Sequence, residues 1–402
     1  MASNRPSTLL LRVDGFGWQD CLATGPGSAI LGSLLFSALF PAPMSVKFLL
    51  RVAGTLLLAW AAAAACVALH TPLPWMLGPL VATSVLSMAG APTESWGPLR
   101  NGGQWAIGAA LGLYFTPEVS ALVGSLWWAI VLGIGWALLL GWGFGAWLYR
   151  LHAPRMHGVP ASMLRSTSYF AGAIGAASEM TLLSERENAR TDLVAASHSL
   201  RLLIVTITIP FALQWSGLQG LDILIPTVRD VSWPGLALLA LLTGAGALVM
   251  DRLGRANPWF MGAMLVSMAV TMAGLHLSAV PQAVVNAAQL VIGVSLGVRF
   301  RAEFLHTAPR WLASVAVGTF GLMGICAAFA AVLAWATGLP WVTLLLGTSP
   351  GGITEMAITA KVLQLGVPVV TAFQVCRLVA VLLLAGPLWN WLERRRVHPT
   401  AR

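Results

Sequence analysis

The sequence Ser349-Pro350-Gly351-Gly352-Ile353-Thr354-Glu355-Met356 interrupts an apolar segment that extends over residues 340–365. A proline followed by two glycines disfavours a continuous helix, so this stretch predicts a helix that stops and restarts just before the glutamate. A similar break, Ala171-Gly172-Ala173-Ile174-Gly175, precedes Ser178-Glu179-Met180 within the apolar segment 161–183. The chain therefore contains two copies of a helix break that is followed by a carboxylate on the first turn of the restarting helix.

An arginine follows each of the two glutamates by 22 residues, and these arginines, Arg201 and Arg377, also lie within apolar segments. His198 and Gln374 stand one turn earlier on the same helix faces. A charge at mid-bilayer costs about 2.5–3.5 kcal/mol on insertion scales, so two matched acid–base pairs indicate a role in handling a solute or a proton. Each guanidinium can neutralise its glutamate, bind an anionic solute in bidentate fashion, or form a structural pair that only fixes helix register.

The composition is that of a polytopic membrane protein. Apolar residues make up 57% of the 402 residues and charged residues only 9%, whereas about 25% of the residues of soluble domains are charged. The net charge of +9 does not predict nucleic-acid binding, because the basic residues lie in short connections between apolar segments. The four cysteines form no CxxC and the seven histidines show no metal-binding spacing, so no metal, disulfide framework or cofactor is predicted.

The apolar segments form two corresponding sets of six. Pro74-Trp75-Met76-Leu77-Gly78 matches Pro258-Trp259-Phe260-Met261-Gly262 at an offset of 184, and seven identities within residues 104–118 recur at an offset of 185. This pattern indicates an internal duplication. The predicted segments are 48–69, 73–90, 102–116, 121–149, 161–183 and 193–215, then 233–250, 258–275, 283–299, 310–338, 340–365 and 368–392. The predicted organisation is an N-terminal extension (1–46), a first repeat (47–215), a linker (216–232), a second repeat (233–395) and a tail (396–402).

The distribution of Lys and Arg predicts the membrane orientation. The basic clusters all fall on the cytoplasmic side if the fifth segment of each set enters the membrane and returns. Each half then has an odd number of crossings, which inverts the second half relative to the first. The predicted fold is an all-α polytopic membrane protein of two inverted repeats, each with about five transmembrane helices and one broken or re-entrant element, and with both termini cytoplasmic. The number of crossings in each half is also odd if the fifth segment is a broken crossing and the third segment does not span.

The first 46 residues do not follow this pattern. Their apolar patch, residues 29–40, is too short to span a bilayer, and Met44 directly precedes the first long apolar segment. We therefore expect Met44 to be the start of the native protein and the first 43 residues to be an extension that is not translated.

The predicted solute- or ion-binding site combines the two breaks, the acids, the arginines and their neighbours. Gln104 and Gln289 begin the third segments and either reach the same cavity or hydrogen-bond between helices. His198 has no histidine counterpart in the second half, and is either a proton carrier or a hydrogen-bond partner. The candidate residues are Glu179, Glu355, Arg201, Arg377, Gly172, Gly175, Ser349, Pro350, Gly351, Gly352, Thr354, His198, Gln374, Gln104 and Gln289.

These motifs resemble the AbrB membrane-protein family, which is named for a regulator of aidB expression and is distinct from the DNA-binding AbrB regulators. The likeness rests on Pro74 to Pro79, Gly172 to Arg201, Pro258-Trp259 and Thr348 to Arg377, and covers about residues 47–395. The resemblance implies an inverted-repeat fold with a crossed pair of broken helices, similar to cation/proton antiporters and anion transporters. Members of the family also carry a label as ammonia monooxygenases.

The favoured interpretation is a secondary active transporter of a small, anionic solute, coupled to H⁺ or Na⁺, in a bacterial inner membrane. A membrane-bound monooxygenase and a membrane regulator that acts indirectly on gene expression are the alternatives. The enzyme alternative is disfavoured because clusters of His, Glu and Asp ligands are absent from the sequence. The predicted partners are the solute or ion and the lipid bilayer, and the sequence leaves a homodimer open.

Overall fold

The computed structural model describes residues 45–156, 158–218, 230–300 and 308–397. The side chains of Arg396 and Val397 are not described. The contacts divide the chain into two units, Met1–Leu49 and Leu50–Arg402. The described residues of the first unit, 45–49, contain the beginning of helix α2 (Val46–Ala68). The predicted extension, the expected start at Met44, and most of the predicted linker and tail lie outside the described residues.

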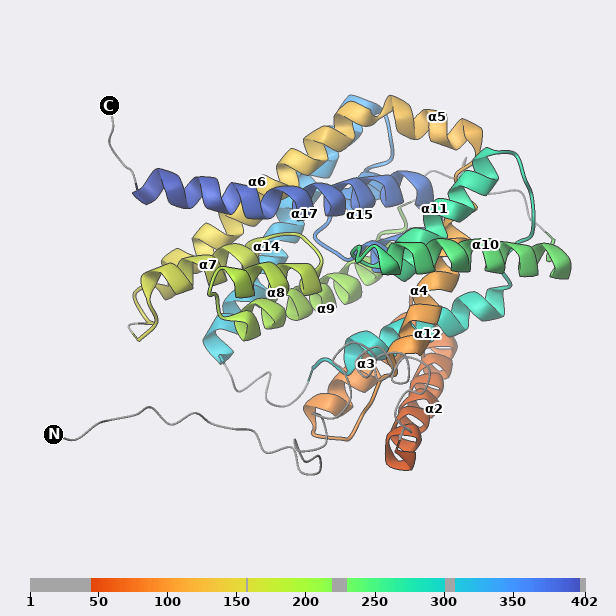
Figure 1. Cartoon of the computed structure of the whole chain (residues 1–402), viewed down its shortest axis with the longest axis horizontal. Helices are drawn as coiled ribbons and strands as arrows, with labels where there is room; N and C mark the ends of the chain where they lie inside the picture. Colours follow the sequence, from red (N-terminus) through yellow and green to blue (C-terminus); the bar gives the residue numbers. More distant parts are fainter. Residues whose placement is uncertain (1–44, 157, 219–229, 301–307, 398–402) are drawn as a thin grey trace, which may run out of the picture. The chain divides into compact units, whose positions relative to one another are not determined.

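The described residues fold into fifteen α-helices without any strand. Figure 1 shows their order along the chain. Besides α2, they are α3 (Pro74–Met88), α4 (Gly97–Gly112), α5 (Pro117–Ser125), α6 (Trp127–His152), α7 (Ala161–Gly172), α8 (Ala177–Arg186), α9 (Thr191–Ser216), α10 (Trp233–Arg252), α11 (Pro258–Met272), α12 (Gln282–Gly297), α14 (Pro309–Thr337), α15 (Trp341–Thr348), α16 (Ile353–Val362) and α17 (Val367–Val397).

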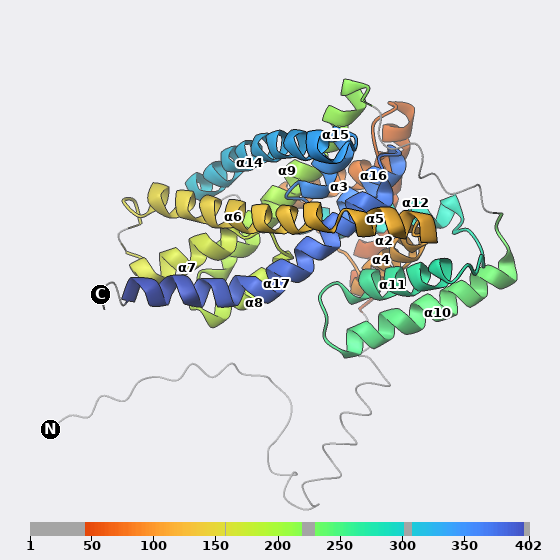
Figure 2. The same cartoon turned by 90° about the horizontal axis from the view of Figure 1, so that it is seen from above.

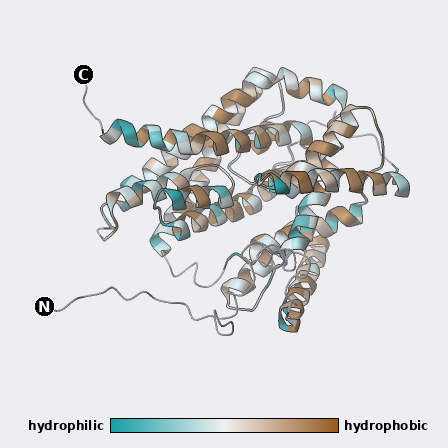
Figure 3. Ribbon diagram, in the orientation of Figure 1, coloured by the Kyte–Doolittle hydropathy of each residue, from teal (hydrophilic) through white to brown (hydrophobic). Residues whose placement is uncertain are grey.

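Six of the described helices, α2, α6, α9, α10, α14 and α17, are long and apolar enough to cross a membrane. A seventh span results if α4 and α5, which are bent by 89° at their junction, count as one broken crossing. Figure 3 shows apolar residues along most of the long helices, whereas hydrophilic residues gather at the C-terminal end of α17. These features confirm the predicted all-α class and support a polytopic membrane protein.

Both predicted helix breaks are present. The first lies between α7 and α8, and the second lies between α15 and α16. Ser349 ends α15 with φ −62° and ψ 148°, because the ring of Pro350 excludes the helical conformation for the residue before it. Each predicted fifth segment is therefore two short helices joined by extended backbone.

The start of the fourth segment differs from the prediction. The sequence predicted one helix over 121–149, whereas the structure has the short helix α5 and begins α6 at Trp127. Thr116 caps α5 by accepting a hydrogen bond from the Val119 N–H, and Pro117 occupies the first turn. Thr-Pro is a typical start signal for a helix, and here it begins α5 well before the first predicted residue.

Close helix packing surrounds the glycines that the two repeats share. A Cβ atom added at Gly108 of α4 would lie within 3.0 Å of the Phe260 backbone in α11. One added at Gly293 of α12 would lie 2.5 Å from the Met76 carbonyl oxygen in α3. Glycine at these positions therefore allows tight helix packing. The contacts join α3, α4, α10, α11 and α12 into one packed group, here called the glycine group.

The broken helices belong to a second packed group, here called the broken-helix group. Its members are α6, α7, α8, α9, α14, α15, α16 and α17. Figure 2 shows α6, α7 and α17 running side by side. The hydroxyl of Tyr169 in α7 donates a hydrogen bond of 2.8 Å to the Ala385 carbonyl of α17. Contacts between the two groups are made mainly through α5 and between α16 and α4.

We expect Gly108→Ala to destabilise the protein by about 1–3 kcal/mol, the usual cost of an overpacked contact. The new methyl group would overlap the α11 backbone, which cannot rotate away. Gly102→Ala on the same helix is the matched control, because an added Cβ there meets no atom within 4 Å, and alanine favours the helix by about 1 kcal/mol. Thermal unfolding of the purified protein in detergent measures both effects. Equal stability of the two variants would contradict the packing argument.

Candidate functional site

Arg201 binds the open end of the first broken helix. Its side chain projects from α9, is only 3% exposed, and donates hydrogen bonds to the carbonyls of Ala171 (3.1 Å) and Ala173 (2.7 Å). The last carbonyls of a helix have no partner within that helix and carry the negative end of its dipole. The guanidinium therefore supplies both the missing donors and an opposite charge at the end of α7.

Arg377 does the same for the second broken helix. It projects from α17, is 6% exposed, and donates to the carbonyls of Ser349 and Gly351, the latter at 2.8 Å. Its Nε atom is buried and has no hydrogen-bond partner among the described residues. The two guanidiniums lie close enough for their charges to repel each other. The two breaks are thus near each other, and each is held by its own arginine.

His198 and Gln374 complete the two arginine sites in the same way. Nη2 of Arg201 lies 2.8 Å from Nδ1 of His198, and Nε2 of His198 lies 2.9 Å from the Phe170 carbonyl. Arginine only donates and a carbonyl only accepts, so His198 must be neutral with its proton on Nε2. Gln374 accepts from Arg377 through Oε1 and donates to the Leu346 carbonyl at 2.6 Å. Of the two predicted roles of His198, the geometry supports that of hydrogen-bond partner.

The Glu–Arg pairing, one of the roles that the sequence left open, is not formed among the described residues. The ion pairs among the described residues are Arg51–Glu94, Arg165–Glu393 and Arg190–Asp192. Each candidate arginine is occupied by carbonyls at the end of the first half-helix, whereas each candidate glutamate lies in the first turn of the second half-helix. The extended residues between the half-helices separate the acid from the base.

The two glutamates have similar positions but different surroundings. Glu355 is 6% exposed, and its carboxylate folds back against Gly352, at the N-terminus of α16. A carboxylate at this end of a helix is stabilised by the helix dipole and the free N–H groups. Glu179 occupies the same position in α8 but is only half-buried. The acid of the second break is therefore the more enclosed one.

Sequence reasoning missed Arg299 and Arg100. Arg299 follows α12 and is close enough to attract the Glu355 carboxylate, without an ion pair within 4.0 Å. It is exposed to solvent, and Arg100 of α4 is near enough to repel it. The sequence assigned Arg299 to a cytoplasmic loop cluster. At the offset of 185, the corresponding residue of the first half is Tyr114, so this cation belongs to one repeat only.

A small cavity adjoins the second break. Its volume is about 10 Å³, roughly the space of one water molecule. Leu202 lines it and would lie 3.2 Å from a Cβ atom added at Gly352. The buried hydroxyl of Thr206 in its wall has no hydrogen-bond partner among the described residues. The lining residues are Leu80, Ser199, Leu202, Leu203, Thr206, Leu296, Arg299 and Phe300. The cavity thus lies between α9 of the broken-helix group and α3 and α12 of the glycine group.

The remaining predicted residues fall in two places. Gln104 and Gln289 lie where α4 crosses α12, next to the close approach of Gly103 to the Ala288 carbonyl. Neither glutamine side chain makes a hydrogen bond to a described residue, so the expected hydrogen bond between helices is not formed. The other predicted residues lie in or next to the two breaks: Gly172, Gly175, Ser349, Pro350, Gly351, Gly352 and Thr354. Among the described residues, no group of three or more His, Cys, Asp or Glu side chains is arranged to hold a metal ion.

The fold and the site define an α-helical membrane protein with two broken helices whose ends are held by buried arginines. The chain belongs to the family described as "Transition state regulatory protein AbrB", whose model matches residues 75–393. The resemblance found in the sequence is therefore confirmed.

Two relatives cover most of the chain. One, from Escherichia coli (strain K12), bears the name "Putative regulator AbrB" and is 26% identical over 328 residues, which are 80% of this chain and 90% of the relative. The other, "Uncharacterized protein YhjN" of Bacillus subtilis (strain 168), is 25% identical over 355 residues, which are 79% of this chain and 87% of the relative.

We expect His198→Gln to keep the stability of the protein, because glutamine offers the same acceptor and donor that neutral histidine offers here. His198→Leu removes both, leaves a buried carbonyl and an arginine N–H unpaired, and should cost about 1–3 kcal/mol. Thermal unfolding of the two purified variants across neutral pH compares them. If His198→Gln were as unstable as His198→Leu, the deduced equivalence of His198 and Gln374 would be wrong.

Proposed function

We propose that the protein is a secondary active transporter of a small anionic solute, coupled to H⁺ or Na⁺ and working by alternating access around its two broken helices. The observation that carries the proposal is the pair of helix breaks in which a buried arginine holds one half-helix and a carboxylate begins the next. Non-helical backbone at membrane depth is tolerated only inside protein or beside a water-filled cavity. Broken helices at such places commonly form the binding sites of transporters.

Reciprocal contacts between corresponding residues of the two halves support an inverted repeat. Gly108 of the first half packs on Phe260 of the second, and Gly293 of the second packs on Met76 of the first. At the offsets found in the sequence, Gly108 corresponds to Gly293 and Met76 corresponds to Phe260. A pseudo-two-fold axis between the halves would produce such reciprocal contacts. Together with an odd number of crossings per half, this arrangement matches the plan of many secondary transporters.

The surroundings of Glu355 favour an anionic solute. The positive N-terminus of α16 and the Arg299 guanidinium both act on this carboxylate. Protonation of Glu355 would remove its negative charge and leave both positive groups for the carboxylate or other anionic group of a solute. Proton and solute would then bind together, which couples their movement.

The same surroundings favour H⁺ over Na⁺ as the coupling ion. Arg299 places a guanidinium charge near Glu355, and a sodium ion bound to that carboxylate would be repelled by it. A proton bound to the carboxylate adds no separate cation to the site. In this scheme Arg201 and Arg377 are positioning residues, because their terminal nitrogens already donate to carbonyls of the broken helices.

The location that we propose is the inner membrane of a bacterium, with both termini in the cytoplasm. The bacterial relatives support the first part. The second part rests on the Lys and Arg residues, which fall on one side of the membrane in the inverted-repeat topology.

Glu355→Gln and Glu179→Gln should each abolish solute flux without unfolding the protein, because a glutamine cannot gain or lose the proton that couples transport. The test reconstitutes each variant in proteoliposomes, imposes a pH gradient and follows the uptake of an anionic metabolite mixture by mass spectrometry. Glu185→Gln, an exposed acid on α8, is the matched control and should transport like the wild type. Unchanged flux in both site variants would refute the proposal.

A further inference from the structure

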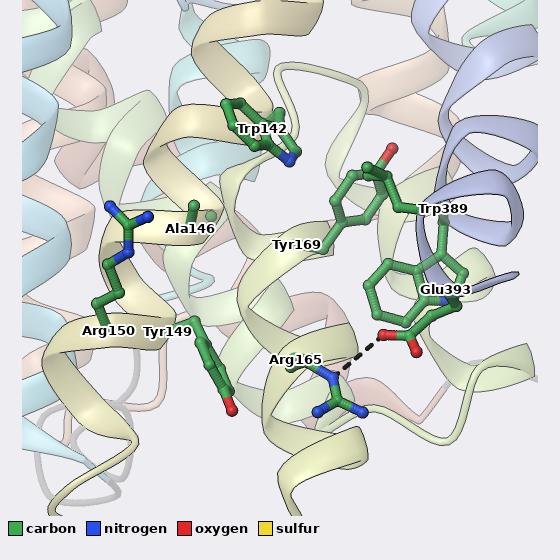
Figure 4. Close-up of a pocket in the computed structure, with 10 residues that line it drawn as sticks. Trp142, Ala146, Tyr149, Arg150, Arg165, Tyr169, Trp389 and Glu393 are labelled. Atoms are coloured by element: carbon green, nitrogen blue, oxygen red, sulfur yellow. Dashed lines mark hydrogen bonds and ion pairs between the residues drawn. The ribbon is translucent and has the colours of Figure 1, made fainter. Parts of the chain in front are cut away.

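A second pocket lies away from the broken helices. It has a volume of about 200 Å³ and lies between α6, α7 and α17, as Figure 4 shows. None of the candidate transport residues lines it. The lining residues are Trp142, Gly145, Ala146, Tyr149, Arg150, Arg165, Tyr169, Trp389, Leu392 and Glu393.

One end of this pocket is basic. Arg165 donates through Nε to Glu393, with 3.1 Å between Nε and Oε1, and both side chains are about a quarter exposed. In Figure 4 the two terminal nitrogens of Arg165 point away from Glu393, toward the end of the pocket where the Tyr149 hydroxyl lies. Arg150, in the last turn of α6, also lines the pocket, and Figure 4 shows its guanidinium on the other side of Tyr149, pointing away from Arg165. Two arginines and one glutamate leave a surplus of positive charge, and the terminal nitrogens of Arg165 make no hydrogen bond to a described residue.

An apolar groove adjoins the pocket. It has a volume of about 470 Å³ between α6 and α14, and Trp142 lines both the groove and the pocket. Its other lining residues are Leu139, Leu140, Gly143, Phe144, Trp147, Val317, Gly318, Gly321, Leu322 and Ile325. The groove therefore lies deeper along the membrane-length helix α6, whereas the basic end lies in the last turn of the same helix.

We propose that the pocket and the groove together bind one anionic phospholipid. Its phosphate would lie against Arg165 and the Tyr149 hydroxyl, the exposed Arg150 side chain would turn toward it, and one acyl chain would pass Trp142 into the α6–α14 groove. Arginine binds phosphate oxygens through its terminal N–H groups, and basic pockets between membrane helices bind anionic headgroups. The order of a charged end and an apolar groove along α6 matches the order of headgroup and chain in a bilayer. A soluble anion would use the charges but not the groove.

The headgroup arm of the test measures binding to the full-length protein in detergent. Phosphatidylglycerol should raise the unfolding temperature and stay bound in native mass spectrometry, whereas phosphatidylcholine with the same chains should do so much less. Arg150→Gln should weaken phosphatidylglycerol binding by about tenfold, the effect of one charge-assisted hydrogen bond. Arg155→Gln is the matched control, because this exposed arginine at the same end of α6 binds the Leu151 carbonyl and lies outside the pocket.

The chain arm uses glycines of α14. Gly321→Phe puts a ring into the groove, where an added Cβ meets no atom within 4 Å, and should weaken phosphatidylglycerol binding. At Gly324 an added Cβ also meets no atom within 4 Å, but this residue does not line the groove. Gly324→Phe should therefore leave phosphatidylglycerol binding unchanged. Equal binding of both lipids, or equal loss in Arg150→Gln and Arg155→Gln, would overturn the proposal. Equal stabilisation by glycerol 3-phosphate would also overturn it, since the site would then serve a soluble phosphate.

Discussion

The buried guanidinium groups of Arg201 and Arg377 make two broken helices possible inside an apolar protein. A helix that ends in the interior leaves several carbonyls without partners, and each unpaired polar group costs several kcal/mol in hydrocarbon surroundings. Arginine meets this need with planar donors and a charge opposite to the negative end of the dipole. The dependence is mutual, because the carbonyls of Ala171, Ala173, Ser349 and Gly351 also provide the electron-rich surroundings that a buried cation requires.

The two breaks share the hydrogen bonds that hold the arginines, but the surroundings of their two glutamates differ. His198 and Gln374 differ in residue type, yet each accepts from its arginine and donates to a carbonyl. The glutamates are identical in type, yet only Glu355 is buried and only Glu355 faces an arginine outside the breaks. Under the proposed transport function both glutamates carry the coupling proton, and Glu355 is the one whose charge also acts on an arginine outside the breaks.

Local chemistry made much of the fold predictable. Pro350 and the neighbouring glycines located the second break, and the four-residue spacing of Gly108 and Gly112 is typical of close helix contacts. The partners of the arginines were not predictable, because sequence spacing places a side chain on a helix face but says nothing about which backbone carbonyls another helix leaves open. Arg299 was missed for a related reason. Counting Lys and Arg in loops assigns every basic residue to the membrane surface, and only the fold brings this one close to Glu355.

The two packed groups differ in which interactions cross between them. Arg201 and Arg377 lie on α9 and α17 and bind the ends of α7 and α15, so all their hydrogen bonds stay within the broken-helix group. Glu355 and Arg299 attract each other across the boundary, and the small cavity is lined by residues of both groups. A rigid displacement of one group against the other would preserve every arginine–carbonyl bond and change the distance between Glu355 and Arg299. Under the proposed transport function, protonation of Glu355 or binding of the solute would change this same attraction. The interaction that couples transport would then also be the contact that changes when the two groups move.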